Sequence, residues 1–197
     1  MILPQALATP RSPTLWSDKQ LQTDISRYIT RQAGALSPDV FASILDRTHP
    51  SRLPAVLWHA SKRHCITGQT LAQHLGMAFA HCARPAELLP QQHWLTLFKR
   101  AGFTQDGQVA KPPATPARLW RAAHPQHARR MSWTPSLDTA HGYAAGDGHA
   151  PGAGRIYTTL AEPHHVLAIN DRNLANPIEV EWVLDPRHLH ITEETPA

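Results

Sequence analysis

The spacing of apolar residues divides the chain into two halves. In the first half they recur every three or four positions, which is the spacing of one face of an α-helix. Such stripes run over residues 40–45, 53–60, 71–82 and 94–98. Ser37 followed by Pro38 is typical of a helix start, and Gly107 marks an end. The pattern predicts a helical domain over residues 21–107, preceded by a flexible lead-in over residues 1–20.

The second half has the texture of strands and turns. Its apolar residues come in short runs separated by Gly, Pro, Asn and Asp. The runs that fit strands are 118–122, 131–134, 155–160, 165–169, 178–184 and 189–192. A short helix fits 136–144, and the three prolines of 108–116 indicate a linker. We therefore expect an α+β protein, with an N-terminal helical bundle, this linker, and a small β-rich domain over residues 117–197.

Charge indicates the kind of partner. The formal net charge of +4, with 14 histidines in addition, favours an anionic one. The stretch from Gly107 to Leu137 has no acidic residue. Its basic side chains are Lys111, Arg118, Arg121, His124, His127, Arg129 and Arg130. This stretch either binds an anion, such as a cofactor phosphate or RNA, or forms a solvated basic loop.

Cysteine usage and hydropathy bear on location and metals. Two cysteines do not make a disulfide framework, and no apolar run reaches the roughly 20 residues of a membrane helix. We therefore expect a cytoplasmic protein with no membrane partner. Cys65 follows His64 and Cys82 follows His81, whereas structural zinc ligands are usually two to four residues apart. We expect no metal, and interpret Cys82 as a core residue.

Three polar motifs lie on the predicted strands. Alternate side chains of a strand share a face, so Glu179 lies beside Glu181 and Ser132 beside Thr134. Arg121 closes the first strand of the domain, and its guanidinium suits a phosphate or a carboxylate. Each motif also has a plain structural interpretation. The glutamates would be the solvated face of an edge strand, Thr134 or Ser136 the cap of the following helix, and Arg121 a surface residue.

The order of these motifs is more specific than any one of them. An arginine, then Ser-x-Thr before a helix, then Glu-x-Glu on a late strand resembles the arginine–serine–glutamate branch of the ADP-ribosyltransferase superfamily. The resemblance covers roughly residues 116–190 and is carried by the segments LWRAA, RRMSWTPSLDTAHGYA, GRIYTTLAEPHHVLAI and EVEWVLDP. These segments look like those of small bacterial and phage-associated proteins of this type. The resemblance implies a split β-sheet fold and NAD as the substrate.

The resemblance also gives each motif a role. Arg121 would hold NAD by its phosphates and the adjoining ribose. Ser132 and Thr134 would support the nicotinamide ribose and the catalytic acid. Glu181 would be that acid, stabilising the positive charge that develops at C1′ as nicotinamide leaves. Glu179 would orient or deprotonate the acceptor.

Two further expectations concern the nicotinamide and the size of the pocket. Tyr143, on the predicted short helix, either stacks on nicotinamide or packs that helix against the core. Ten residues separate Arg121 from Ser132, where larger members of the superfamily place helices. Part of the NAD pocket is therefore expected to come from the helical half, or to be reduced.

The implied function is transfer of ADP-ribose from NAD to a macromolecular acceptor. The protein would be a bacterial or prophage toxin or effector, and it would act in the cytoplasm of its own cell or of a target cell. Glu-x-Glu favours a protein arginine as acceptor, with nucleic acid such as RNA as the other candidate. A neutralising partner protein would accompany such a toxin. Two alternatives remain open. One is an NAD glycohydrolase using the same residues with water as acceptor, and the other is a non-catalytic module that binds nucleic acid or protein.

Overall fold

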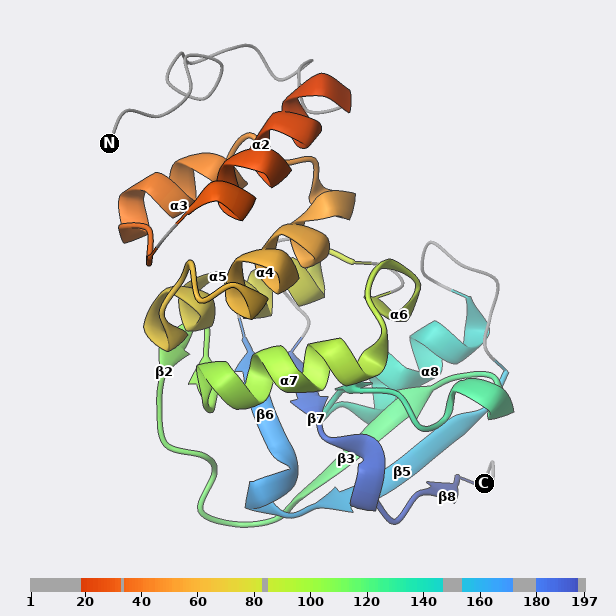
Figure 1. The fold of residues 1–197 in the computed structure, drawn as a ribbon. Coiled ribbons are helices and arrows are strands. Elements are labelled where there is room, and N and C mark those ends of the chain that lie inside the picture. The colour runs from red at the N-terminus through yellow and green to blue at the C-terminus, as the bar shows by residue number, and fades with distance from the viewer. Residues whose placement is uncertain (1–18, 33, 83–84, 147–153, 172–179, 195–197) are drawn as a thin grey trace.

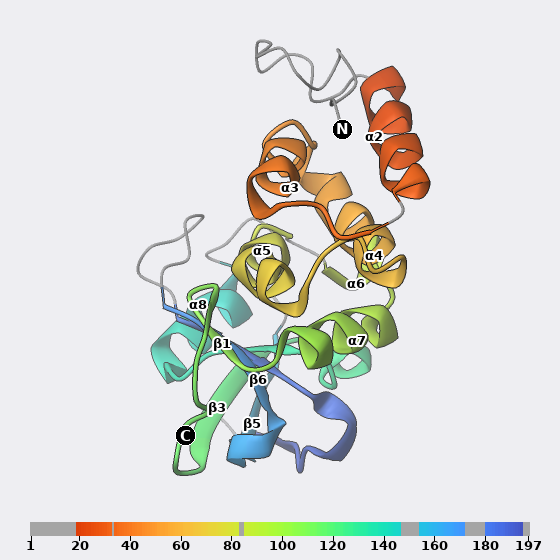
Figure 2. The same cartoon turned by 60° about the vertical axis from the view of Figure 1, so that its left-hand side comes forward.

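The computed structural model describes residues 19–32, 34–82, 85–146, 154–171 and 180–194. Over these residues the protein is a mixed α+β structure, with helices first and two small β-sheets after them. Figures 1 and 2 show the N-terminal helices at one end of the molecule and most of the strands at the other. The helices α5 (Gly68–Ala80) and α7 (Gln91–Ala101) lie between them. The predicted α+β class and the order of its two halves are confirmed.

The first half consists of short helices, and capping side chains mark the starts of two of them. Besides α5 and α7 they are α2 (Lys19–Arg31), α3 (Pro38–Leu45), α4 (Leu53–Lys62), which follows the 3-10 turn η2 (Pro50–Arg52), and α6 (Pro85–Leu88). The Ser37 hydroxyl accepts a hydrogen bond from the Val40 amide at 3.4 Å and caps α3. Thr67 caps α5 in the same way, accepting from the Thr70 amide at 3.0 Å. These two caps satisfy amides that have no partner within the helix, and so favour the starts of α3 and α5.

The larger sheet has five strands in the order β2-β1-β6-β7-β4. They are β1 (Thr104–Gln105), β2 (Gln108–Val109), β4 (Ser132–Trp133), β6 (Val166–Asn170) and β7 (Glu181–Leu184). Neighbouring strands are antiparallel except β1 and β6, which run parallel. The structure differs here from the predicted boundaries, because residues 104–109 belong to the sheet rather than to the end of the helical domain and the linker. Asp106 and Gly107, at φ 49° and 75°, turn the chain between β1 and β2.

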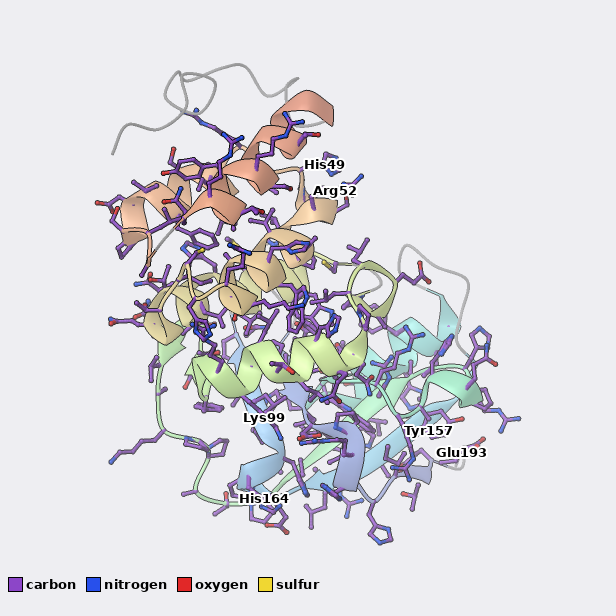
Figure 3. The ribbon with its side chains drawn as sticks, in the orientation of Figure 1. His49, Arg52, Lys99, Tyr157, His164 and Glu193 are labelled. Atoms are coloured by element: carbon purple, nitrogen blue, oxygen red, sulfur yellow. The ribbon has the colours of Figure 1, made fainter. Side chains whose placement is uncertain are left out.

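The smaller sheet consists of β3 (Ala117–Ala122), β5 (Ile156–Ala161) and β8 (Thr192–Glu193), all antiparallel. Figure 3 shows Tyr157 and Glu193 together, at paired positions of β5 and β8. Trp120 and Thr134 exchange two backbone hydrogen bonds of 2.8 Å, which tie β3 to the end of β4. The two sheets are therefore joined at this point, where the chain passes from β4 towards α8 (Leu137–Ala145).

Short 3-10 turns replace parts of two predicted strands. His165 belongs to η4 (Pro163–His165), so β6 starts one residue later than expected. The strand predicted at 189–192 is wrong for all but its last residue, because η5 (Pro186–His188) precedes an extended segment and β8 begins at Thr192. A further turn, η3 (Pro125–His127), lies between β3 and β4. Each of these turns begins with a proline, whose fixed φ suits the first position of a helical turn.

The larger sheet separates two apolar cores. One lies between the two sheets and includes Trp133 and Leu184. The other is the core of the helices, and Ala168 and Val183 from the larger sheet are buried in it. Lys99 of α7 also lies near this sheet, with its Nζ 3.5 Å from Asp185 Oδ2 (Figure 3). The helical half and the larger sheet consequently share one core.

Candidate functional site

Ser132 and Glu181 meet on the side of the larger sheet that faces the helices. They lie on neighbouring antiparallel strands, and Glu181 alternates with Val183, which is buried in the helical core. The Ser132 hydroxyl donates a hydrogen bond to Glu181 Oε1 at 2.6 Å. Hydrogen bonds to an ionised carboxylate are among the stronger ones in proteins. Two motifs on separate strands thus form one unit.

The interpretation of Glu181 as the solvated face of an edge strand is wrong. Its strand, β7, lies between β6 and β4 in the larger sheet, and the side chain is only partly exposed. A partly buried carboxylate needs hydrogen-bond donors to compensate for lost water. The neighbouring strands on both sides supply them.

The second donor is Asn170, a residue that sequence reasoning missed. Asn170 ends β6 and pairs directly with Glu181 across the strands. Its Nδ2 donates to Glu181 Oε2 at 3.2 Å, and its side chain is buried, with 6% exposure. An asparagine at the end of an apolar run normally indicates a turn. Only the register between β6 and β7 would have identified it as a partner of the glutamate.

Arg121 approaches the site from the smaller sheet. Its Nη1 donates to the Ser132 carbonyl oxygen at 2.5 Å and its Nε to the His127 carbonyl oxygen at 3.3 Å. Burial first, and then the positive charge of Arg130, lower the pKa of Arg121 to about 10, while the negative charge of Glu181 opposes this shift. The guanidinium therefore remains charged at neutral pH. Within the described part of the chain its Nη2 has no protein partner, which leaves donors for an anion.

The remaining predicted site residues lie differently. Thr134 is buried, and its hydroxyl accepts from the Ser136 amide at 3.2 Å, which stabilises the turn into α8. Ser136 is the residue that caps that helix, accepting from the Thr139 amide at 3.1 Å. Tyr143 lies on α8 with 45% exposure, so its interpretation as a core residue is wrong. Glu179 lies outside the described residues.

Helix α5 and Cys82, two residues beyond its end, close the site from the helical half. A Cβ atom at Gly76 would lie 2.5 Å from Asn170 Oδ1, so the helix backbone meets this side chain directly. Cys82 is buried, as expected, and its Sγ donates to the Ala78 carbonyl oxygen at 3.0 Å. Burial, and second the negative charge of Glu181, raise the pKa of the Cys82 thiol to about 11. The thiol is therefore protonated at neutral pH and is a poor nucleophile.

The arrangement suits stabilisation of a developing positive charge next to a bound anion. The two carboxylate oxygens of Glu181 accept hydrogen bonds from different strands, Oε1 from Ser132 and Oε2 from Asn170. The carboxylate is thus held between its two neighbouring strands. A guanidinium lies near it, with donors suited to phosphate.

The basic stretch before α8 is divided in its roles. Arg121 is part of the site, and Arg130 is near enough to influence its charge. Arg129 donates from Nη1 to the Leu189 carbonyl oxygen at 3.2 Å and so links this stretch to the segment after β7. Lys111 and Arg118 are exposed. The stretch therefore contributes to the structure as well as to the positive charge around the site.

The described residues contain no group of three or more His, Cys, Asp and Glu side chains that could hold a metal ion. Nor is any helix among them long and apolar enough to span a bilayer. No protein-family model matches the chain, and no curated protein or solved structure matches it either.

Proposed function

We propose that this protein is an NAD-dependent ADP-ribosyltransferase that modifies a macromolecular acceptor and acts as a toxin or effector. The observation that carries the proposal is the hydrogen bond from the Ser132 hydroxyl to the Glu181 carboxylate. The backbone carbonyl oxygen of Ser132 also accepts a hydrogen bond from Arg121. These are the three positions for which the sequence resembles the arginine–serine–glutamate branch. Two small sheets, joined between Trp120 and Thr134, are compatible with its split β-sheet fold.

The proposed chemistry starts with cleavage of the bond between C1′ of the ribose and the nicotinamide nitrogen. Nicotinamide leaves with the bonding electron pair, and C1′ becomes positively charged. Glu181, held by Ser132 and Asn170, stabilises that charge and accepts a hydrogen bond from the ribose 2′-hydroxyl. Arg121 binds the phosphates of NAD. An acceptor atom then bonds to C1′ and loses its proton, for which the resemblance implicates Glu179.

The acceptor favoured by Glu-x-Glu is a protein arginine, with RNA as the other candidate. The net charge of +4 and the basic stretch before α8 suit an anionic partner, which a nucleic acid or an acidic protein surface would provide. A neutralising protein would be a further partner of a toxin of this kind. NAD is the substrate, and the reaction as proposed needs no metal.

Nicotinamide release from NAD, measured by chromatography, tests the proposal. Glu181→Gln keeps the size of the side chain and removes its charge, so we expect release to fall roughly a hundredfold or more. Glu193→Gln is the matched control, because Glu193 is an exposed acid that pairs with Arg155 in the smaller sheet. Equal rates for the wild type and Glu181→Gln would refute the proposed role of the carboxylate.

A second measurement follows the ADP-ribose with labelled NAD. Label on protein or on RNA supports the transferase and identifies the class of acceptor. Label that appears only as free ADP-ribose identifies water as the acceptor and the protein as an NAD glycohydrolase. A wild type that neither binds nor cleaves NAD would instead be a binding module for nucleic acid or protein.

A further inference from the structure

We infer that Asn170 is a positioning residue for Glu181, and that Gly76 of helix α5 holds Asn170 in place. The helical half would then be part of the catalytic unit rather than a separate module. This inference rests on the proposed function, because it takes Glu181 as the catalytic acid.

The Glu181 carboxylate is held at both of its oxygens. A glutamate side chain has three rotatable bonds, and one hydrogen bond at one oxygen leaves the carboxylate free to turn about that contact. Ser132 donates to Oε1 from one neighbouring strand, and Asn170 donates to Oε2 from the other. Both donors sit on strands that are paired with β7, so their separation is set by the sheet. Two donors at opposite oxygens fix the plane of the carboxylate, which a single donor does not.

The Asn170 amide has a defined orientation. Its nitrogen faces the carboxylate of Glu181, and its Oδ1 faces the backbone of α5 at Gly76. The reverse orientation would bring an amide oxygen against a carboxylate oxygen, which is repulsive. With 6% exposure, Asn170 has little room for another rotamer. The amide therefore holds a fixed position between the helix and the glutamate.

Position 76 of α5 is occupied by glycine, which suits its contact with Asn170. Gly76 is buried in the interior of α5, where glycine is the poorest helix former apart from proline. A glycine at such a position indicates a packing reason. Here the reason is visible, because a Cβ would lie 2.5 Å from Asn170 Oδ1, well inside van der Waals contact. Leu71 and Leu75 of the same helix are fully buried, so α5 has little freedom to move away.

These contacts predict that positions 76 and 170 depend on each other. Any side chain at 76 displaces the Asn170 amide and so disturbs Glu181 without touching it. If residue 170 is shortened to alanine, the space is vacated and a Cβ at 76 fits. A purely structural role of each residue would instead give two independent effects.

The experiment is a double-mutant cycle on the full chain, with steady-state nicotinamide release as the readout. We expect Asn170→Ala to lower kcat about tenfold to a hundredfold, as for loss of a hydrogen bond to a charged group, while KM for NAD changes less than about threefold. Gly76→Ala should lower kcat in the same sense. The double variant should be no slower than Asn170→Ala alone.

Two matched controls use the same substitutions elsewhere. Gln105→Ala removes an amide that donates to Asp171 Oδ2 at 3.0 Å, an exposed amide–carboxylate pair at the same end of the larger sheet. Gly34→Ala adds a Cβ with no atom within 4 Å. Both should keep wild-type kcat. Urea unfolding of every variant separates loss of folding from loss of positioning.

The outcomes distinguish the two proposals. If Gly76→Ala fails to fold while the double variant folds, the contact between the two residues is supported, and kcat of Asn170→Ala decides the positioning role. Wild-type kcat in Asn170→Ala, or effects in the double variant that multiply, would overturn the inference while an active wild type upholds the proposed function. A wild type that releases no nicotinamide would refute the proposed function and this inference with it.

Discussion

Ser132→Ala removes one hydroxyl from the site and leaves the rest of β4 in place. The Ser132 carbonyl, which accepts from Arg121 Nη1 at 2.5 Å, belongs to the backbone and is retained. The strand pairing of residue 132 with Val183 is retained as well. What disappears is the hydrogen bond of 2.6 Å to Glu181 Oε1. The substitution therefore tests this one contact.

The expected size follows from the kind of bond and its exposure. A hydrogen bond to a charged group contributes about 1.5–3 kcal/mol. Ser132 is partly exposed, so water can replace some of the lost interaction, and the lower figure applies. Since about 1.4 kcal/mol corresponds to a factor of ten in rate, we expect kcat for nicotinamide release to fall about tenfold.

The control is the same substitution four residues along the chain. Ser136 caps α8, and its replacement by alanine should lower the free energy of unfolding by about 1 kcal/mol without changing kcat. Initial rates over a range of NAD concentrations, together with urea unfolding, measure both quantities for both variants. Wild-type kcat in Ser132→Ala, or equal losses in the two variants, would refute the reasoning.

Two further predictions concern the arginine of the site and the acid dependence of the fold. Arg121→Lys should raise KM for NAD on the order of tenfold in an initial-rate titration, because an ammonium lacks the fork of donors of a guanidinium. Arg155→Lys on the smaller sheet is the control. An unchanged KM in Arg121→Lys would contradict the role of Arg121. Hydrogen bonds from Arg187 lower the pKa of Asp185 to about 2 from an ordinary 3.8. The ionised Asp185 therefore stabilises the fold above about pH 4, and this contribution is lost as the pH falls towards 2. Urea unfolding should show that the free energy of unfolding falls by about 1–2 kcal/mol between pH 5 and 2, a figure discounted for the partly exposed Arg187. Asp185→Asn should make the free energy of unfolding depend less on pH over this range. The same pH dependence in the variant and the wild type would contradict the role of Asp185.

Capping residues and helical periodicity allowed much of the first half to be predicted. Ser37 stands where the structure places a helix start, because its side-chain oxygen accepts from a free amide there. The short hairpin of β1 and β2 was missed, although its Asp106–Gly107 turn is a known signal for a two-residue hairpin. Two-residue strands show no alternation, and Gly107 was interpreted as the end of a helix instead.

The candidate site was predictable only in part. Alternation along single strands identified Ser132 and Glu181, because each motif carries its own polar pattern. Asn170 and Gly76 belong to no motif, and each gains its meaning from a partner far away in the sequence. Such contacts depend on strand register and on the packing of a helix against a sheet, which residue type alone does not determine.

The parallel pairing of β1 with β6 affects the order in which the molecule is completed during biosynthesis. β1 follows α7 closely and pairs at once with β2, but its parallel partner β6 is made only after β3, β4, α8 and β5. Closing so long a loop is slow compared with forming helices from local contacts. The helices can therefore pack soon after they leave the ribosome, while the sheet that completes their core waits for β6 and β7. A nascent chain that has not yet reached residue 181 has its helices and lacks the carboxylate, so the proposed activity would arise only late in synthesis.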